Sequence, residues 1–251
     1  MAKRIYANER ENNIFEKKVM PENNIYYATL KTRHGYRWLR RFQDILFSLI
    51  AIIVLSPVML ITVVSIIIDD PKGGPVFSQI RVGKNGKEFK MYKFRSMVVD
   101  AEDRLKELLE ENEMDGPVFK IADDPRITRV GKFIRKTSID EIPQFFNVLI
   151  GNMSFIGPRA SGAGALDNYL ADEKDKMKVL PGITGYTQAY YRNGLSVREK
   201  RLKDAWYANN VTISLDVRIL LKSFITVFKR ENVYTNEAGT EKENLWIDVG
   251  E

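Results

Sequence analysis

The feature that most constrains this chain is an uninterrupted apolar run. Residues 45–68 read ILFSLIAIIVLSPVMLITVVSIII and contain no charged side chain. Since about 20 apolar residues in a helix suffice to cross the hydrocarbon core of a bilayer, the run is long enough to do so. It also begins too far into the chain to be a typical cleaved signal peptide. The sequence therefore predicts a membrane helix over residues 36–70.

The topology of this helix is left open by the residues themselves. Ser56-Pro57 lies near the middle of the run, where proline removes a helical hydrogen bond and favours a bend. The serine hydroxyl can satisfy the backbone group that proline leaves free. Basic residues precede the run, and others follow it soon enough to resist export. The helix either bends and leaves by the face it entered, or spans the bilayer and places the rest of the chain outside the cell.

The net charge of +6 is confined to the part of the chain that precedes the apolar run. Residues 1–41 hold ten Lys or Arg and four Asp or Glu, and the remainder is balanced. This distribution suits an anionic lipid surface. A nucleic-acid-binding domain would instead carry its basic excess on itself. We therefore expect a bilayer, and no nucleic acid, as partner. Residues 1–35 are expected to form a polar and basic leader that is partly disordered.

The residue types that are missing limit the chemistry. The chain has no cysteine and one histidine, His34, which lies in the leader. Disulfide and thiolate chemistry are therefore excluded, and so are a histidine-based triad in the body of the chain and a multi-histidine metal site. Carboxylates, Arg, Lys, hydroxyl groups and tyrosine remain for any reaction.

Beyond the apolar run, the pattern is that of one compact α+β domain, mainly helical, over residues 71–235, with a C-terminal tail over 236–251. Residues 76–82 and 88–97 predict a small β-hairpin. Helical spacing of apolar residues predicts an amphipathic helix over 101–114 and further helices over 196–209 and 215–229.

Two adjacent carboxylates, Asp140 and Glu141, stand in a basic, turn-rich stretch that runs from residue 131 to residue 159. A carboxylate can attack phosphorus or hold Mg²⁺, and guanidinium groups bind phosphoryl oxygens bidentately. A structural interpretation is also open, because Ser138 and Glu141 have the spacing of a helix capping box, which is a common motif. Pro143 fits that interpretation poorly and suits the first position of a helix better.

Taken in order, the motifs of the chain resemble those of the bacterial sugar transferases known as monotopic phosphoglycosyl transferases, over about residues 36–234. The matching positions are Ser56-Pro57, Gly74-Pro75-Val76-Phe77, Lys93-Phe94-Arg95-Ser96-Met97, Asp124-Pro125-Arg126-Ile127-Thr128, Arg135-Lys136-Thr137-Ser138-Ile139-Asp140-Glu141-Ile142-Pro143-Gln144, Asn147-Val148, Gly157-Pro158-Arg159, Pro181-Gly182-Ile183-Thr184-Gly185 and Asp216.

The resemblance implies a reaction and a location. Such enzymes transfer a sugar-1-phosphate from a UDP-sugar to polyprenyl (undecaprenyl) phosphate, releasing UMP, as the priming step of exopolysaccharide, capsule or other surface glycan synthesis. It implies a re-entrant membrane helix broken at Ser56-Pro57, interfacial amphipathic helices, and a place on the cytoplasmic face of a bacterial inner or plasma membrane. A homodimer is a further expectation. The alternative is a catalytically inactive, membrane-anchored scaffold of a glycan assembly pathway.

The resemblance also implies roles for individual residues. Asp140 is expected to be the nucleophile that forms a covalent aspartyl-phosphosugar intermediate, and Glu141 the Mg²⁺ ligand. The expected substrate-binding residues are Lys93, Arg135, Arg159, Arg192 and Asp216, and Asp216 could equally cap the helix that follows it.

The chain departs from the family pattern in two segments, residues 160–164 after Gly-Pro-Arg and residues 189–193. Both departures put the identity of the sugar in doubt.

Overall fold

The computed structural model describes residues 34–108, 124–164, 169–191 and 195–228. Nearly all of the predicted leader and all of the predicted C-terminal tail lie outside these ranges. Within them the protein is mainly helical with two small sheets, in agreement with the predicted α+β class.

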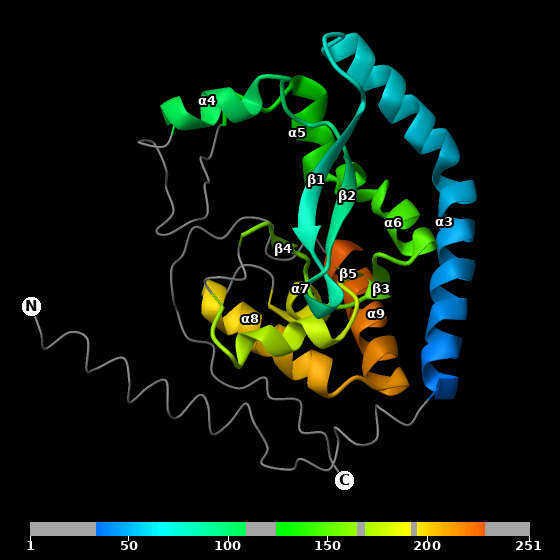
Figure 1. The fold of residues 1–251 in the computed structure, drawn as a ribbon. Helices are drawn as coiled ribbons and strands as arrows, with labels where there is room; N and C mark the ends of the chain where they lie inside the picture. The colour runs from blue at the N-terminus through cyan, green and yellow to red at the C-terminus, as the bar shows by residue number, and fades with distance from the viewer. Residues whose placement is uncertain (1–33, 109–123, 165–168, 192–194, 229–251) are drawn as a thin grey trace, which may run out of the picture.

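The apolar run lies in a single long helix, α3 (His34–Asp69), that forms one side of the molecule (Figure 1). The helix is continuous through Pro57, so the predicted break does not divide it into two helices, and α3 curves along its length (Figure 1). Proline 57 has no N–H to offer the carbonyl of Ile53, and Ser56 Oγ donates to that carbonyl over 2.7 Å. This is the compensation predicted from the sequence, and it explains why the helix survives the proline.

The predicted hairpin is confirmed. Strands β1 (Val76–Val82) and β2 (Glu88–Phe94) pair antiparallel from Val76 opposite Phe94 to Val82 opposite Glu88. The short strand β4 (Ser161–Gly162) adds to the other edge of β1, which gives the order β2-β1-β4. A second sheet pairs β3 (Ser154–Ile156) in parallel with β5 (Gly182–Thr184).

Short helices surround these sheets. They are α4 (Ala101–Leu108), α5 (Arg129–Lys136), the 3₁₀ turn η3 (Ile139–Glu141), α6 (Gln144–Ile150), the 3₁₀ turn η5 (Glu173–Lys178), α7 (Tyr186–Tyr190), α8 (Val197–Asn209) and α9 (Ile213–Phe228). The helices predicted over 196–209 and 215–229 are therefore confirmed as α8 and α9. The helix predicted over 101–114 is observed as α4, and its last six residues lie outside the described ranges.

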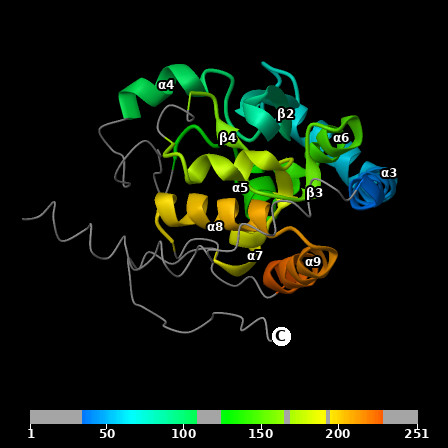
Figure 2. The same cartoon turned by 60° about the horizontal axis from the view of Figure 1, so that its bottom comes forward.

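The two ends of α3 pack against the same domain. Near its C-terminal end, Ile66 is buried against Phe94 of β2 and Ile134 of α5. Asp69 accepts a hydrogen bond from the first turn of α5, at the Val130 N–H (2.9 Å). The middle of the helix lies alongside α6 in both views (Figure 1, Figure 2).

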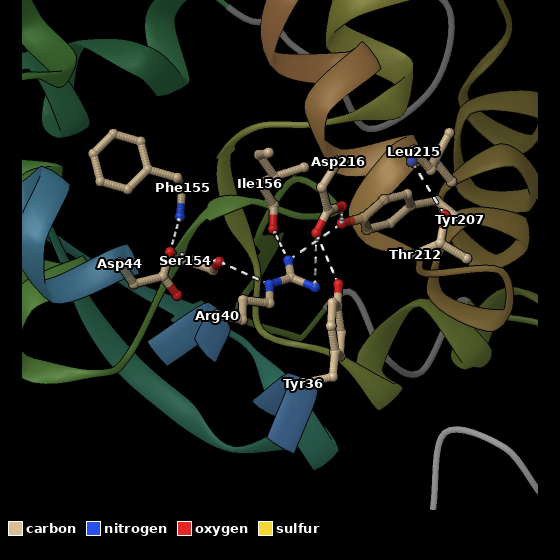
Figure 3. A network of polar contacts seen from close by, with 10 residues as sticks. All are labelled: Tyr36, Arg40, Asp44, Ser154, Phe155, Ile156, Tyr207, Thr212, Leu215 and Asp216. Carbon is tan, nitrogen blue, oxygen red and sulfur yellow. Dashed lines mark hydrogen bonds and ion pairs between the residues drawn. The ribbon is translucent and has the colours of Figure 1, made fainter. Parts of the chain in front are cut away.

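At its N-terminal end, α3 is held by a polar network that centres on Arg40 and Asp216 (Figure 3). The two oxygens of Asp216 accept hydrogen bonds from Tyr36 (2.9 Å) and Tyr207 (2.6 Å), and Arg40 Nη1 lies 3.6 Å from Oδ2. Arg40 also donates to the Ile156 carbonyl. This network joins α3 to α8, α9 and β3, so the membrane helix is an integral part of the fold.

Candidate active site

One face of the β1–β2 hairpin provides a base for the acid pair. Side chains alternate along a strand, and Lys93 stands opposite Phe77 on the face that also carries Met91. Asn147 of α6, which is fully buried, fixes this face against the helix: its Oδ1 accepts from Tyr92 N (2.9 Å) and its Nδ2 donates to Lys90 O (2.7 Å). The Asn147 amide therefore fixes the position of Lys93 relative to the segment that leads into α6.

A sharp turn brings the carboxylates to Lys93. Helix α5 ends at Lys136, and Ser138 then adopts a left-handed conformation (φ 58°, ψ 18°) that is uncommon for a residue other than glycine. The chain then passes through η3 into α6, whose N-cap is Pro143. The unusual conformation of Ser138 thus reverses the chain just before Asp140.

The capping-box interpretation of this segment is wrong. Ser138 makes no capping hydrogen bond, and the Glu141 side chain binds Lys93 Nζ across 3.0 Å instead. A true capping box does occur in the chain, at Ser196 and Glu199 on α8, where both reciprocal bonds are present. The same spacing therefore has a structural role in α8 and a different one at the acid pair.

The two carboxylates sit in opposite electrostatic environments. Burial raises the pKa of Asp140, with a further rise from Glu141, against the opposing effect of Lys93 and Arg135. Burial alone would raise the pKa of Glu141 as well, but Lys93 and Arg159 outweigh it and lower that pKa. Neighbouring acids whose pKa values are pushed apart are suited to different tasks. Glu141 is the more firmly ionised of the two.

Arg159 reaches the site from a loop that is packed against backbone. A Cβ on Gly157 would lie 2.3 Å from the Leu180 carbonyl oxygen, and one on Gly182 would lie 2.1 Å from the Gly157 nitrogen. Only glycine fits at such a crossing. The guanidinium of Arg159 lies 3.9 Å from Glu141 Oε1 and its side chain is 66% exposed, so the ion pair is weak and the cation faces open space.

The remaining predicted site residues have different placements. Arg135 is exposed at the end of α5, near enough to lower the pKa of Asp140. Arg192 lies outside the described residues. The carboxylate of Asp216 is bound by Tyr36 and Tyr207 in the network of Figure 3. Its predicted alternative role as a helix cap is wrong, because Thr212 Oγ1 accepts the capping hydrogen bond from Leu215 N at the start of α9. The structure therefore groups Lys93, Arg135, Asp140, Glu141 and Arg159, and its polar contacts tie Asp216 to α3 and α8.

Several motif residues that carry the family resemblance have structural roles. Arg95 forms a 2.6 Å ion pair with Asp70 just beyond α3. Asp124 and Arg126 form a buried bidentate pair, with Nε–Oδ1 and Nη2–Oδ2 distances of 2.9 and 2.7 Å. These contacts hold the segments that lead into β1 and α5.

Sequence reasoning missed Arg81. It lies on β1, two positions after Gln79 and on the same face as Lys93, and it is opposite Gly162 of β4. Its charge contributes to the lowered pKa of Glu141. The hairpin was predicted without a register, and the observed register is what places Arg81 and Lys93 on one face.

The donor set at the acid pair fits a magnesium ion shared with a substrate. Among the residues that the structure describes, no group of three or more His, Cys, Asp or Glu side chains could hold a metal by itself. Mg²⁺ commonly binds through one or two carboxylates and completes its coordination with water and substrate phosphates. Glu141, which is ionised and partly exposed, could serve as such a ligand.

The protein thus combines a helix that is long and apolar enough to cross a membrane with an α+β domain that holds an acid pair among cations. The sequence model described as "Bacterial sugar transferase" matches residues 35–230, and the chain belongs to that family. The family predicted from the motifs is thereby confirmed.

Three relatives illustrate the similarity. The chain is 42% identical over 214 residues to "Galactosyl transferase CpsE" of Streptococcus agalactiae, covering 83% of this chain and 47% of the relative. It is 40% identical over 210 residues to "Undecaprenyl-phosphate galactose phosphotransferase" of Salmonella typhimurium, covering 80% and 43%. It is 35% identical over 204 residues to "Exopolysaccharide production protein PSS" of Rhizobium leguminosarum, covering 76% and 96%. The chain thus spans about half the length of the first two relatives.

Proposed function

We propose that this protein transfers a sugar-1-phosphate from a UDP-sugar to polyprenyl phosphate at a bacterial membrane, as a priming step of surface glycan synthesis. The observation that carries the proposal is that the pKa values of the two neighbouring carboxylates are shifted in opposite directions. Asp140 is buried with a raised pKa, while Glu141 beside it binds Lys93 and has a lowered pKa. The name of the Salmonella relative, which specifies undecaprenyl phosphate and galactose, supports the same class of reaction.

The proposed chemistry has two displacements at one phosphorus atom. An oxygen of the Asp140 carboxylate attacks the β-phosphorus of the UDP-sugar, and the bond from that phosphorus to the bridging oxygen breaks, so that UMP leaves. The product is an acyl phosphate that carries the sugar. An oxygen of polyprenyl phosphate then attacks the same phosphorus and restores the carboxylate.

The cations around the acid pair suit this chemistry. Lys93, Arg135 and Arg159 bring positive charge to a place where an anionic nucleophile must approach a diphosphate. Mg²⁺ held by Glu141 would supply further charge neutralisation for the diphosphate. The raised pKa of Asp140 corresponds to a carboxylate that is less well solvated, and a poorly solvated anion is a better nucleophile.

A mostly apolar groove that reaches Ile139, the residue before Asp140, suits a lipid acceptor. A cavity of about 580 Å³ lies between α3 and α5, and its lining includes Val58, Ile61, Phe133 and Ile139. Ile139 immediately precedes Asp140 in η3. A prenyl chain in this groove would place its phosphate end near the nucleophile while its tail stays beside the membrane helix.

The contacts of α3 support the re-entrant topology. Arg40 and Asp44 at one end of the helix bind the segment 154–156, and Ile66 and Asp69 at the other end pack against β2 and α5. A helix that spanned the bilayer would hold its ends on opposite sides, whereas one domain here contacts both. The predicted homodimer stays a prediction.

The reaction is tested by the release of UMP. The full chain in detergent or nanodiscs is supplied with Mg²⁺, polyprenyl phosphate and a panel of UDP-sugars. We expect activity with at least one donor, and we expect Asp140→Asn and Glu141→Gln each to reduce the rate by about a thousandfold or more, since each removes a group used in the chemistry. Near-normal activity in either variant would reject its assigned role. A folded wild type that is inactive with every donor would favour the scaffold.

The topology is tested with a single cysteine, since the chain has none. A cysteine added after Glu251 is expected to resist a membrane-impermeant thiol reagent in intact cells and to react after the cells are opened. Labelling in intact cells would place the domain outside and overturn the re-entrant arrangement.

A further inference from the structure

The guanidinium of Arg81 lies on the same face of the hairpin as Lys93, which binds Glu141. On β1, Phe77, Gln79 and Arg81 alternate onto the face that carries Lys93. Arg81 Nη2 donates to Gln79 Oε1 over 2.6 Å, which holds the plane of the guanidinium. Strand β4 closes over it, because Gly162 pairs with Arg81 and a Cβ on Gly162 would lie 3.6 Å from Nη1.

One of its donors has no acceptor. Arg81 Nε is shielded from solvent and makes no hydrogen bond within the described part of the chain. A buried donor that is left without a partner is costly. Gln79 is neutral, and no carboxylate within ion-pairing distance of Arg81 is found among the described residues, so its Nε donor stays without a partner there.

Other cations lie around Glu141. Lys93 Nζ is 3.0 Å from Glu141 Oε1, and Arg159 Nη2 is 3.9 Å from the same oxygen. The positive charge of Arg81 also helps to lower the pKa of Glu141, after the larger effects of Lys93 and Arg159. Burial lowers the pKa of Arg81, and Arg159 lowers it further against the opposing effect of Glu141. One carboxylate therefore faces three cations.

We propose that Arg81 is a further substrate-binding residue, which together with Arg159 forms an anion site for the diphosphate of the nucleotide-sugar. This assignment rests on the proposed function. It adds that the donor phosphates are bound on the side of the acid pair where Arg81 and Arg159 lie. The planar guanidinium presents its donors in a fork that matches phosphoryl oxygens. Gly162 lies in the segment that departs from the family pattern, so this segment shapes the site through its pairing with Arg81.

The test measures binding and kinetics in the full chain in nanodiscs, with UDP and Mg²⁺ as the binding probe. Arg81→Met is expected to weaken UDP binding by about ten- to a hundredfold and to raise the KM for the donor by a similar factor. Arg81→Lys keeps the positive charge but loses the planar fork of donors. Its affinity for UDP and its KM for the donor are expected to lie between those of Arg81→Met and the wild type. The KM for polyprenyl phosphate should stay unchanged in both variants. Lys90→Met is the matched control, because Lys90 is exposed on the opposite face of the same hairpin, opposite Ile80.

The outcomes separate this inference from the function on which it rests. If the wild type neither binds UDP nor releases UMP from any donor, the proposed function is rejected and this inference is rejected too. If the wild type is active but both Arg81 variants bind UDP as the wild type does, this inference alone is rejected. Equal changes in the KM for donor and acceptor would reveal a purely structural role and would also reject it. Should Arg81→Met fail to fold, Arg81→Lys supplies the deciding comparison.

Discussion

Alanine at Gly157 offers a direct test of how the structure positions Arg159. A Cβ at this position would lie 2.3 Å from the Leu180 carbonyl oxygen, 2.7 Å from the Gly182 nitrogen and 2.9 Å from the Pro181 carbonyl carbon. All three neighbours are backbone atoms, so no side chain can rotate away. Since real Cβ atoms essentially never approach other atoms within 3.0 Å, the loop must move by about 0.7 Å or more.

Such a movement would displace Arg159, which lies two positions along the loop, from the acid pair. A misplacement of about 1 Å at a catalytic site can cost on the order of a hundredfold in rate, and overpacking costs roughly 1–3 kcal/mol of stability. We therefore expect Gly157→Ala to stay folded, to melt at a lower temperature, and to release UMP from its UDP-sugar about 10- to 100-fold more slowly.

The control for this variant is Gly74→Ala. A Cβ on Gly74 meets no atom within 4 Å, so this variant should keep both its melting temperature and its rate. The reasoning would be refuted by a folded Gly157→Ala protein with wild-type kcat/KM, because the loop crossing would then not control Arg159. Equal losses in the two glycine variants would refute it as well.

Three further predictions concern the acid pair and its support. Lys93→Met removes the cation that opposes the burial effect at Asp140, so the pKa of Asp140 should rise further. Because the nucleophile must be ionised, activity then falls at a higher pH as the solution is acidified, and an unchanged acidic limb of the pH–rate profile would contradict this. Asn147→Leu leaves the Tyr92 N–H and the Lys90 carbonyl unpaired, and should lower the free energy of unfolding by about 2–4 kcal/mol in chemical denaturation. Ser138→Gly should be tolerated, since Ser138 has a φ of 58°, which suits glycine. Ser138→Val should lower the free energy of unfolding by about 1–2 kcal/mol or more. Equal stability of the two variants would show that the turn relaxes freely.

Local patterns were sufficient to predict much of the fold. The alternation in residues 88–97, the apolar spacing of residues 215–229 and the length of the apolar run each depend on neighbours in the sequence, and all three elements are observed. The role of Ser56 was also predictable, because the carbonyl that Pro57 leaves free lies within the same helical turn. These features need no knowledge of the tertiary structure.

The parts of the site that depend on distant contacts were not predictable in the same way. Whether Ser138 and Glu141 form a cap depends on Lys93, which is 48 positions from Glu141 in the sequence. The placement of Asp216 depends on Tyr36, 180 positions away, and no local pattern indicates this pairing. Arg81 was missed because the assignment of roles relied on motif matches and did not use the faces of the hairpin.

The attachment of α3 at both ends has a consequence for how this protein can be dissected. Residues 36–44 complete the polar network of Figure 3, and Ile66 fills the interior beside Phe94 and Ile134. Deleting the apolar helix to obtain a soluble catalytic fragment would therefore remove part of the interior along with the anchor. The length and curvature of α3, which is continuous through Pro57, also set the distance between two fixed attachment points (Figure 1). Replacement of α3 by an unrelated straight membrane helix should for this reason disrupt the active site itself, even where the new helix inserts well.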